Sequence, residues 1–101
     1  MRLIFTEQSL NSLQLSLEFM LKVQKIPEET VYKIQNDLLA RTDELLVNPE
    51  QGQIEESLKS LGLEHRRLIE GHFKIVYRVS KEVIYITDFF DSRQHPKKMK
   101  R

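Results

Sequence analysis

The sequence predicts an α+β fold, in which a short N-terminal strand and an antiparallel helical hairpin pack on a small, mainly antiparallel β-sheet. Apolar residues recur at three- and four-residue steps through the first half of the chain, which is typical of helices. From His65 onward the apolar period changes to two, which is typical of strands. Glycine and proline stand between these segments, where helices and strands would end.

Composition excludes several classes of protein. The chain has 101 residues, 40% hydrophobic and 31% charged, which is ordinary for a globular domain. This length supports one core, so we expect a single domain over residues 1–101. The absence of cysteine excludes disulfides, thiol catalysis and cysteine-ligated zinc. No apolar run approaches the roughly 20 residues that cross a bilayer, and the N-terminus does not resemble a signal peptide. We therefore expect a cytoplasmic protein without membrane attachment.

The first helix follows a short apolar strand. Residues 3–5 (Leu-Ile-Phe) predict that strand, and Thr6 can cap the helix that comes next. A wide apolar stripe predicts that this helix is largely buried. The stripe consists of Leu10, Leu13, Leu17, Met20 and Leu21, and Leu15, Phe19 and Val23 widen it.

The second helix begins just after Pro27 and is predicted to end at Asn48-Pro49. Pro27 stops the first helix, and the acidic pair Glu28-Glu29 suits the positive end of the next helix dipole. Because the link is very short, the two helices should form an antiparallel hairpin. One apolar face is expected, formed by Val31, Ile34, Leu38 and Leu45 with support from Leu39 and Leu46.

A connector over residues 49–62 separates the helices from the strands. Residues 54–61 can make a turn or two of helix, and the Glu55-Glu56 pair there is expected to lie on the surface. Three successive antiparallel strands are predicted near residues 65–70, 73–79 and 83–90.

The turn Gly71-His72 sets the register of the first two strands. A two-residue turn there places Leu68 opposite Ile75 and Ile69 opposite Lys74. One face then holds the core residues Leu68, Phe73, Ile75, Tyr77 and Val79, and the other holds Arg67, Lys74, Val76 and Arg78. The last strand is expected to turn Ile84 and Ile86 to the core, which adds Tyr85 and Thr87 to the cationic face; a one-residue slip would instead bury Tyr85.

Positive charge is concentrated in the C-terminal part. Residues 65–101 contain ten Lys or Arg and four Asp or Glu, whereas residues 1–64 contain six and eleven. A cationic sheet face with a basic tail suits a polyanion or an acidic partner. The alternative explanation is an ordinary solvated charged face.

The order of these elements resembles a known family. The specific part consists of residues 66–69 (Arg-Arg-Leu-Ile), 73–79 (Phe-Lys-Ile-Val-Tyr-Arg-Val), 83–86 (Val-Ile-Tyr-Ile) and 91–98 (Asp-Ser-Arg-Gln-His-Pro-Lys-Lys). Preceded by a strand, a helical hairpin and a glycine-containing connector, this ordered set resembles the RelE/ParE superfamily of bacterial toxins. The resemblance in element order covers the whole chain.

This resemblance implies the toxin of a type II toxin–antitoxin module, of the plasmid-stabilisation kind, that a co-expressed cognate antitoxin neutralises. RelE-like members enter the ribosomal A site and cleave mRNA, whereas ParE-like members poison DNA gyrase and have no established nuclease chemistry. The mRNA-cleaving branch needs cations at the scissile phosphate and a general acid or base near the C-terminus.

The C-terminal residues favour the ParE-like branch. Lys74 and Arg93 are similar in position to basic residues of the mRNA-cleaving branch, but no tyrosine follows Arg93, and Met99 stands near the position expected for one. An arginine three residues before a proline, as in Arg93 and Pro96, is more similar to the ParE-like pattern. His95 is the remaining acid–base candidate in the tail.

We therefore expect a ParE-like toxin that inhibits DNA gyrase. The first alternative is a ribosome-dependent mRNA endoribonuclease that would use His95, Lys74 and Arg93 as catalytic candidates. The second is a degenerate, non-toxic member that acts only as an antitoxin-binding partner. No metal or cofactor is expected, because the three histidines have no ligand spacing. The residues expected to bind the target or phosphate are Arg67, Lys74, Arg78, Tyr85, Arg93, Lys97 and Lys98.

Overall fold

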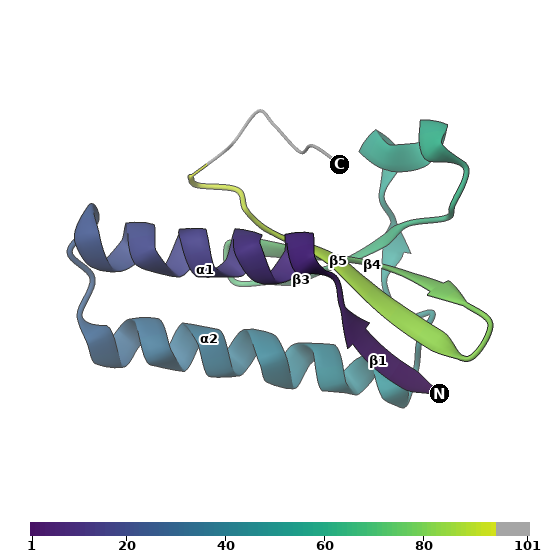
Figure 1. The fold of residues 1–101 in the computed structure, drawn as a ribbon, viewed down its shortest axis with the longest axis horizontal. Helices are drawn as coiled ribbons and strands as arrows, with labels where there is room; N and C mark the ends of the chain where they lie inside the picture. The colour runs from purple at the N-terminus through teal and green to yellow at the C-terminus, as the bar shows by residue number, and fades with distance from the viewer. Residues whose placement is uncertain (95–101) are drawn as a thin grey trace.

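The computed structural model describes residues 1–94, in which two α-helices pack on a five-stranded sheet. Figure 1 shows α1 and α2 side by side as a hairpin, with β1 leading into α1. The elements in chain order are β1 (Arg2–Phe5), α1 (Glu7–Lys22), α2 (Glu28–Asp43), the 3-10 helix η1 (Glu44–Leu46), β2 (Gln53–Ile54), the 3-10 helix η2 (Glu56–Leu61), β3 (Arg66–Glu70), β4 (Phe73–Ser80) and β5 (Val83–Asp91).

The strand order in the sheet is β1-β5-β4-β3-β2. β2, β3, β4 and β5 pair with their neighbours in antiparallel fashion, and β1 pairs with β5 in parallel. The α+β class, the helical hairpin and the three C-terminal strands are as the sequence predicts. The two-residue strand β2 within the connector was not predicted, and neither was the position of β1 beside β5.

The β3–β4 register is the predicted one. Leu68 lies opposite Ile75 and Ile69 opposite Lys74. Gly71 in the intervening turn has a φ of 58°, a left-handed conformation that glycine adopts without strain from a side chain. The tight turn therefore fixes which side chains of the hairpin share a face.

One irregularity interrupts the β4–β5 pairing. Val76 lies opposite Asp88 and Tyr77 lies opposite Ile86, so Thr87 is an extra residue on β5. The hydroxyl of Thr87 donates a hydrogen bond to the carbonyl oxygen of Val76 over 3.3 Å. Such a β-bulge shifts the alternation of faces by one residue.

The bulge decides which residues of the second half of β5 enter the core. Ile84 and Ile86 face the core, so uninterrupted alternation would bring the carboxylate of Asp88 into the same apolar layer. With the bulge, Phe89 takes the core position and is 1% exposed. Phe89 stacks on Phe5 with ring centroids 6.2 Å apart, which ties β1 to this part of the core.

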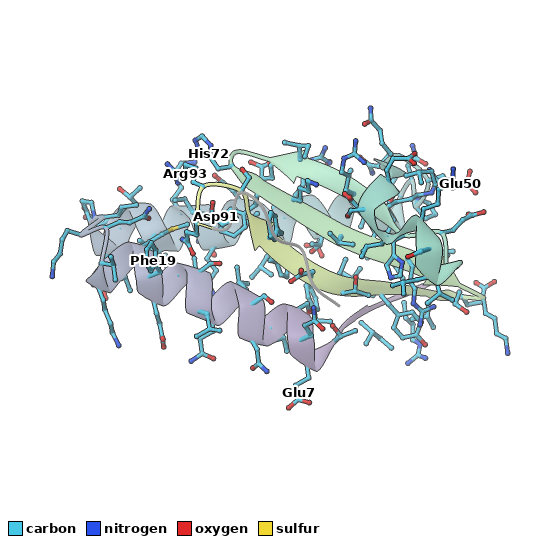
Figure 2. The ribbon with its side chains drawn as sticks, turned by 90° about the horizontal axis from the view of Figure 1, so that it is seen from above. Glu7, Phe19, Glu50, His72, Asp91 and Arg93 are labelled. Atoms are coloured by element: carbon cyan, nitrogen blue, oxygen red, sulfur yellow. The ribbon has the colours of Figure 1, made fainter. Side chains whose placement is uncertain are left out.

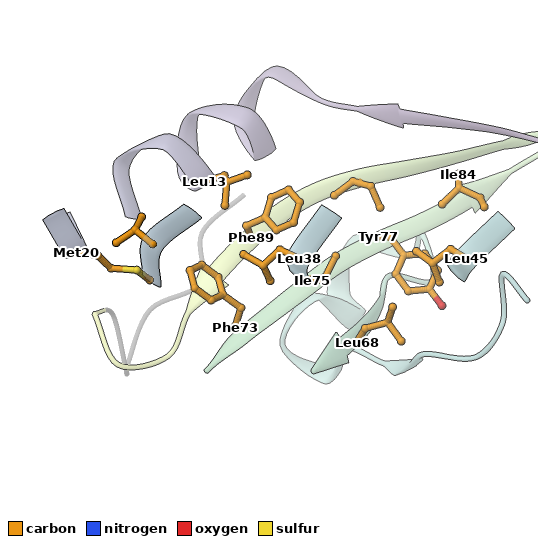
Figure 3. Packing of buried hydrophobic residues seen from close by; sticks show 12 residues of the cluster. Leu13, Met20, Leu38, Leu45, Leu68, Phe73, Ile75, Tyr77, Ile84 and Phe89 are labelled. Atoms are coloured by element: carbon orange, nitrogen blue, oxygen red, sulfur yellow. The ribbon is translucent and has the colours of Figure 1, made fainter. Parts of the chain in front are cut away.

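The hydrophobic core lies between the hairpin and one face of the sheet, as Figure 3 shows. Side chains from α1, α2, β3, β4 and β5 meet there, so every long element contributes to it. Burial of this apolar surface is the main favourable term in folding. The buried cluster consists of Leu13, Met20, Val31, Leu38, Leu45, Leu68, Phe73, Ile75, Tyr77, Ile84, Ile86 and Phe89.

The prediction that α1 is largely buried is wrong. Its buried face is centred on two serines, Ser9 and Ser16, together with Leu13 and Met20. Small side chains let the helix approach the sheet closely, so the helix is turned away from the centre of its apolar stripe. The exposed apolar residues of this segment are Leu10, Leu15, Phe19 and Val23.

Two smaller expectations are also corrected. α2 ends at Asp43 rather than near Asn48, because its last turn tightens into the 3-10 helix η1, a common ending for an α-helix. Val79 is 37% exposed rather than buried in the core. The pairing of β3 with β4 reaches only as far as Tyr77, so Val79 lies beyond the end of β3 and has a paired strand only on its β5 side.

Tyr77 holds the connector against the sheet. Its side chain is fully buried, and its hydroxyl donates a hydrogen bond to the carbonyl oxygen of Pro49 over 2.8 Å. The same hydroxyl oxygen accepts a hydrogen bond from the backbone N–H of Gly52 over 2.9 Å. A side chain on Gly52 would place its Cβ 2.7 Å from that oxygen, so glycine is required for this close approach.

We expect Tyr77→Phe to lower the free energy of unfolding by about 1–3 kcal/mol, because it leaves a buried donor and acceptor without a partner. Chemical denaturation measures the change. Tyr32→Phe is the matched control, since Tyr32 is 65% exposed, and should change stability by less than about 0.5 kcal/mol. Equal effects of the two substitutions would contradict the role of the Tyr77 hydroxyl.

Candidate functional site

The sheet face that lies away from α1 and α2, which we call the outer face, carries several of the predicted target-binding residues. By strand alternation from the core residues, Arg67, Lys74, Arg78 and Tyr85 all project from it. The structure divides them into two pairs with different surroundings.

Lys74 and Arg67 share one acidic partner, Glu55. The Lys74 ammonium nitrogen lies 3.3 Å from Oε1 of Glu55, and Nη1 of Arg67 lies 3.7 Å from the same oxygen. Glu55 is only 3% exposed, although the sequence led us to expect it on the surface. The buried carboxylate thus neutralises part of the positive charge predicted for this face.

The position of Glu55 follows from the connector. It is the residue before η2, and its Oε2 accepts hydrogen bonds from the backbone N–H of Ser57, over 3.2 Å, and from the Ser57 hydroxyl. Burial pushes the pKa of the Glu55 carboxyl upward, but the Ser57 hydrogen bonds and the charge of Lys74 outweigh burial, so the pKa lies below its usual 4.5. Glu55 is therefore ionised at neutral pH.

Arg67 also holds the edge of the sheet. Its guanidinium donates to the carbonyl oxygen of Ile54 and, over 3.1 Å, to Oε1 of Gln53, and these two residues form β2. Three acceptors from the connector therefore surround this side chain. The surroundings of Arg67 are those of a structural residue rather than a free phosphate-binding cation.

Arg78 and Tyr85 form the second pair, directly opposite each other on β4 and β5. The guanidinium carbon of Arg78 lies 4.7 Å from the centroid of the Tyr85 ring, within the range of a cation–π contact. Within residues 1–94, Arg78 has no carboxylate partner. Both side chains are partly exposed, so this pair offers a charged, stacked surface to a partner.

Arg93 lies at the other end of the sheet, after β5. Its backbone N–H donates to Oδ1 of the buried Asp91 over 2.9 Å. Ser92 donates to the carbonyl oxygen of His72 through both its N–H and its hydroxyl, each over 2.9 Å. The side-chain amide of Gln94 donates to the carbonyl oxygen of Ser16 in α1 over 3.1 Å. These bonds fix the backbone on both sides of Arg93.

Figure 2 shows His72, Asp91 and Arg93 together at this end of the molecule. The Arg93 side chain is 44% exposed, and its Nε lies 4.0 Å from Oδ1 of Asp91. Oδ2 of Asp91 has no hydrogen-bond partner among the residues that the structure describes. The structure does not bring Arg93 together with the Arg78–Tyr85 pair.

Three predicted site residues, His95, Lys97 and Lys98, lie outside the described residues. In residues 1–94, no group of three or more acidic or histidine side chains is arranged to hold a metal ion. No helix in the same part of the chain is long and apolar enough to cross a membrane.

The sequence reasoning missed Glu55 as part of the outer face. The available signal was its position: an acidic residue directly before a short helical pattern can accept hydrogen bonds from the first turn, which holds it near the chain. Whether such a residue then lies over a cation depends on where the connector crosses the sheet.

We expect Glu55→Gln to lower the free energy of unfolding at neutral pH by about 1–2 kcal/mol, because it removes the charge that Lys74 and Arg67 face. Since the folded-state pKa of Glu55 is depressed, its contribution is present above pH 4.5 and is lost as the pH falls from there through the folded value. The difference between wild type and Glu55→Gln should therefore shrink on acidification.

Denaturation curves measured from neutral to acidic pH provide this test. The neighbouring Glu56, whose side chain is 73% exposed, supplies the control Glu56→Gln, which should follow the wild-type pH dependence. A Glu55→Gln curve parallel to the wild-type curve at every pH would contradict the ionic role of Glu55.

Comparison with known proteins identifies a solved structure with a similar fold. No protein-family model matches the sequence, and no curated protein is found to match it. Among solved structures, the chain is similar to a chain of "Chromosomal ParDE TA system from P. aeruginosa", with a TM-score of 0.70 and 19% sequence identity, over 90% of this chain and 95% of that one. The chain therefore has a ParE-like α+β fold, as the resemblance of its sequence to RelE/ParE toxins implied.

Proposed function

We propose that this protein is the toxin of a type II toxin–antitoxin module, that it is ParE-like and inhibits DNA gyrase, and that a cognate antitoxin neutralises it. One observation carries the proposal: the chain matches, along 90% of its length, a chain of a structure described as a ParDE TA system. The resemblance of residues 66–98 to RelE/ParE toxins supports the same conclusion from the sequence.

The geometry of the site supports an inhibitor that acts by binding rather than by cleavage. A nuclease would need cations held free for the scissile phosphate. Lys74, a candidate for that role, contacts the buried Glu55 carboxylate instead. Among the predicted target-binding residues that the structure describes, the cations without a contact to Glu55 are Arg78, stacked on Tyr85, and Arg93, on its fixed backbone. These groups are suited to contact with an acidic surface of a target protein.

We expect expression of the chain without a partner to arrest bacterial growth, and the purified protein to inhibit gyrase-catalysed supercoiling. A translation-coupled mRNA cleavage assay should leave ribosome-bound mRNA intact. Codon-specific mRNA cuts would promote the endoribonuclease alternative. Normal colony formation at good soluble yield would indicate a non-toxic protein that only binds an antitoxin.

Substitutions separate binding from acid–base chemistry. Arg93→Ala should weaken gyrase inhibition about tenfold or more, because a guanidinium makes paired hydrogen bonds to a carboxylate that alanine cannot replace. His95→Ala should retain inhibition, whereas loss of a general acid or base would cost about 10²–10⁴ in a cleavage rate. Lys59→Ala removes a cation whose side chain is 76% exposed on η2 and serves as the charge-matched control.

Inhibition titrations with the three variants measure these effects. Equal inhibition by Arg93→Ala and Lys59→Ala would remove Arg93 from the target-binding surface. A His95→Ala protein without activity but with wild-type stability would contradict inhibition by binding alone.

A further inference from the structure

A pocket of about 130 Å³ opens between α2 and the turn that joins β3 to β4. We call it the α2 pocket. Its apolar lining residues are Ile34 and Leu38 from α2 and Phe73 from β4. Leu38 and Phe73 are at most 2% exposed, so this lining is continuous with the core. Since an apolar cavity of about 150 Å³ can hold a benzene molecule, the pocket has room for a single aliphatic or small aromatic side chain.

The acidic groups around the pocket already have cationic partners. Asp37 lines the pocket and its Oδ2 lies 2.8 Å from the ammonium nitrogen of Lys33. Glu70 also lines it, and its Oε1 lies 3.5 Å from Nε of Arg41. These two carboxylates therefore need no further cation from a partner.

Within residues 1–94, Arg93 is the Lys or Arg that lines the pocket, and the hydrogen-bonding capacity of its guanidinium is largely unused. A guanidinium has five N–H donors. In residues 1–94 its charged contact is with Asp91, at 4.0 Å from Nε, which is the outer limit of an ion pair. The side chain is 44% exposed, so an incoming carboxylate can reach it. The fixed backbone around it lowers the cost of ordering on binding.

We propose that the α2 pocket and Arg93 together bind a peptide segment of the protein partner, with one apolar side chain seated against Ile34, Leu38 and Phe73 and one carboxylate paired with Arg93. The inference rests on the proposed function, in which the partner is the antitoxin. It adds a mode of neutralisation: a carboxylate bound to Arg93 withdraws that guanidinium from the target.

The apolar lining of the pocket determines the apolar side chain of the bound peptide, and Arg93 determines its carboxylate. An apolar side chain gains from leaving water only where the lining is apolar, as it is at Ile34, Leu38 and Phe73. A carboxylate matches the Arg93 guanidinium, which within residues 1–94 still has donors to offer, whereas Asp37 and Glu70 are already paired with cations. A short acidic peptide with a neighbouring aliphatic or aromatic residue combines both requirements.

A library of short random peptides displayed on phage and selected against the purified full chain tests this proposal. We expect enrichment of sequences with Asp or Glu near a large apolar residue. Synthetic copies of the enriched peptides should bind Arg93→Ala about tenfold or more weakly than wild type, since the lost hydrogen bonds involve charged groups. Lys59→Ala should bind like wild type.

Ile34→Phe tests the apolar half, because the larger side chain would fill the pocket and should weaken peptide binding about tenfold. Its fold is checked by thermal unfolding. If this variant does not fold, the alternative test is to measure the changes in backbone amide chemical shift when the peptide is added to the wild-type protein. Those shifts should centre on Ile34, Leu38, Gly71 and Phe73.

The proposal is overturned if no peptide is enriched, if the enriched peptides are basic, or if Arg93→Ala leaves their affinity unchanged. Shifts centred on another face would also overturn it. If the chain arrests growth but the selected peptides bind elsewhere, this site is rejected and the toxin function is retained. If the peptides bind at the pocket but the chain does not arrest growth, the toxin function is rejected and the site is retained.

Discussion

The pairing of β4 with β5, with one extra residue at Thr87, is the constraint on which the rest of the structure depends. β5 lies between β1 and β4, so its register determines the placement of the N-terminal strand as well as that of the hairpin. The bulge turns Phe89 to the core and keeps Asp88 on the opposite face. A slip of one residue would exchange those two side chains and place the Asp88 carboxylate beneath the helical hairpin.

The same pairing arranges the charges of the outer face, but the connector determines what they do. Glu55 places a buried carboxylate against Lys74 and Arg67, and these cations stabilise the connector rather than remaining free. Removing either partner of such a buried contact leaves charge without compensation, which is costly inside a protein. The two other predicted cations that the structure describes lie near the ends of the sheet, with Arg78 on Tyr85 and Arg93 after β5.

Much of the fold could be predicted because its signals are local. The helical period, the change to a period of two at His65 and the Gly71 turn depend on residues close together in sequence, so the helices, the three strands and the β3–β4 register followed from them. The place of Tyr85 on the same face as Arg78 followed from the assignment of Ile84 and Ile86 to the core, whereas their direct pairing is a finding of the structure. The resemblance to RelE/ParE toxins and the fold of the solved ParDE chain agree.

The sequence by itself determined the N-terminal strand, the helical hairpin, the three C-terminal strands, their order and the basic character of the C-terminal part, because periodicity, turn residues and charge are properties of the chain. Only the tertiary structure decided that α1 buries Ser9 and Ser16 beside Leu13 and Met20, that Thr87 forms a bulge, and that Glu55 contacts Lys74. Each of these depends on how closely two distant segments approach. A helix rotates to the face that packs most closely on its sheet, and a connector places its charges wherever it crosses, so neither outcome is encoded in a local pattern.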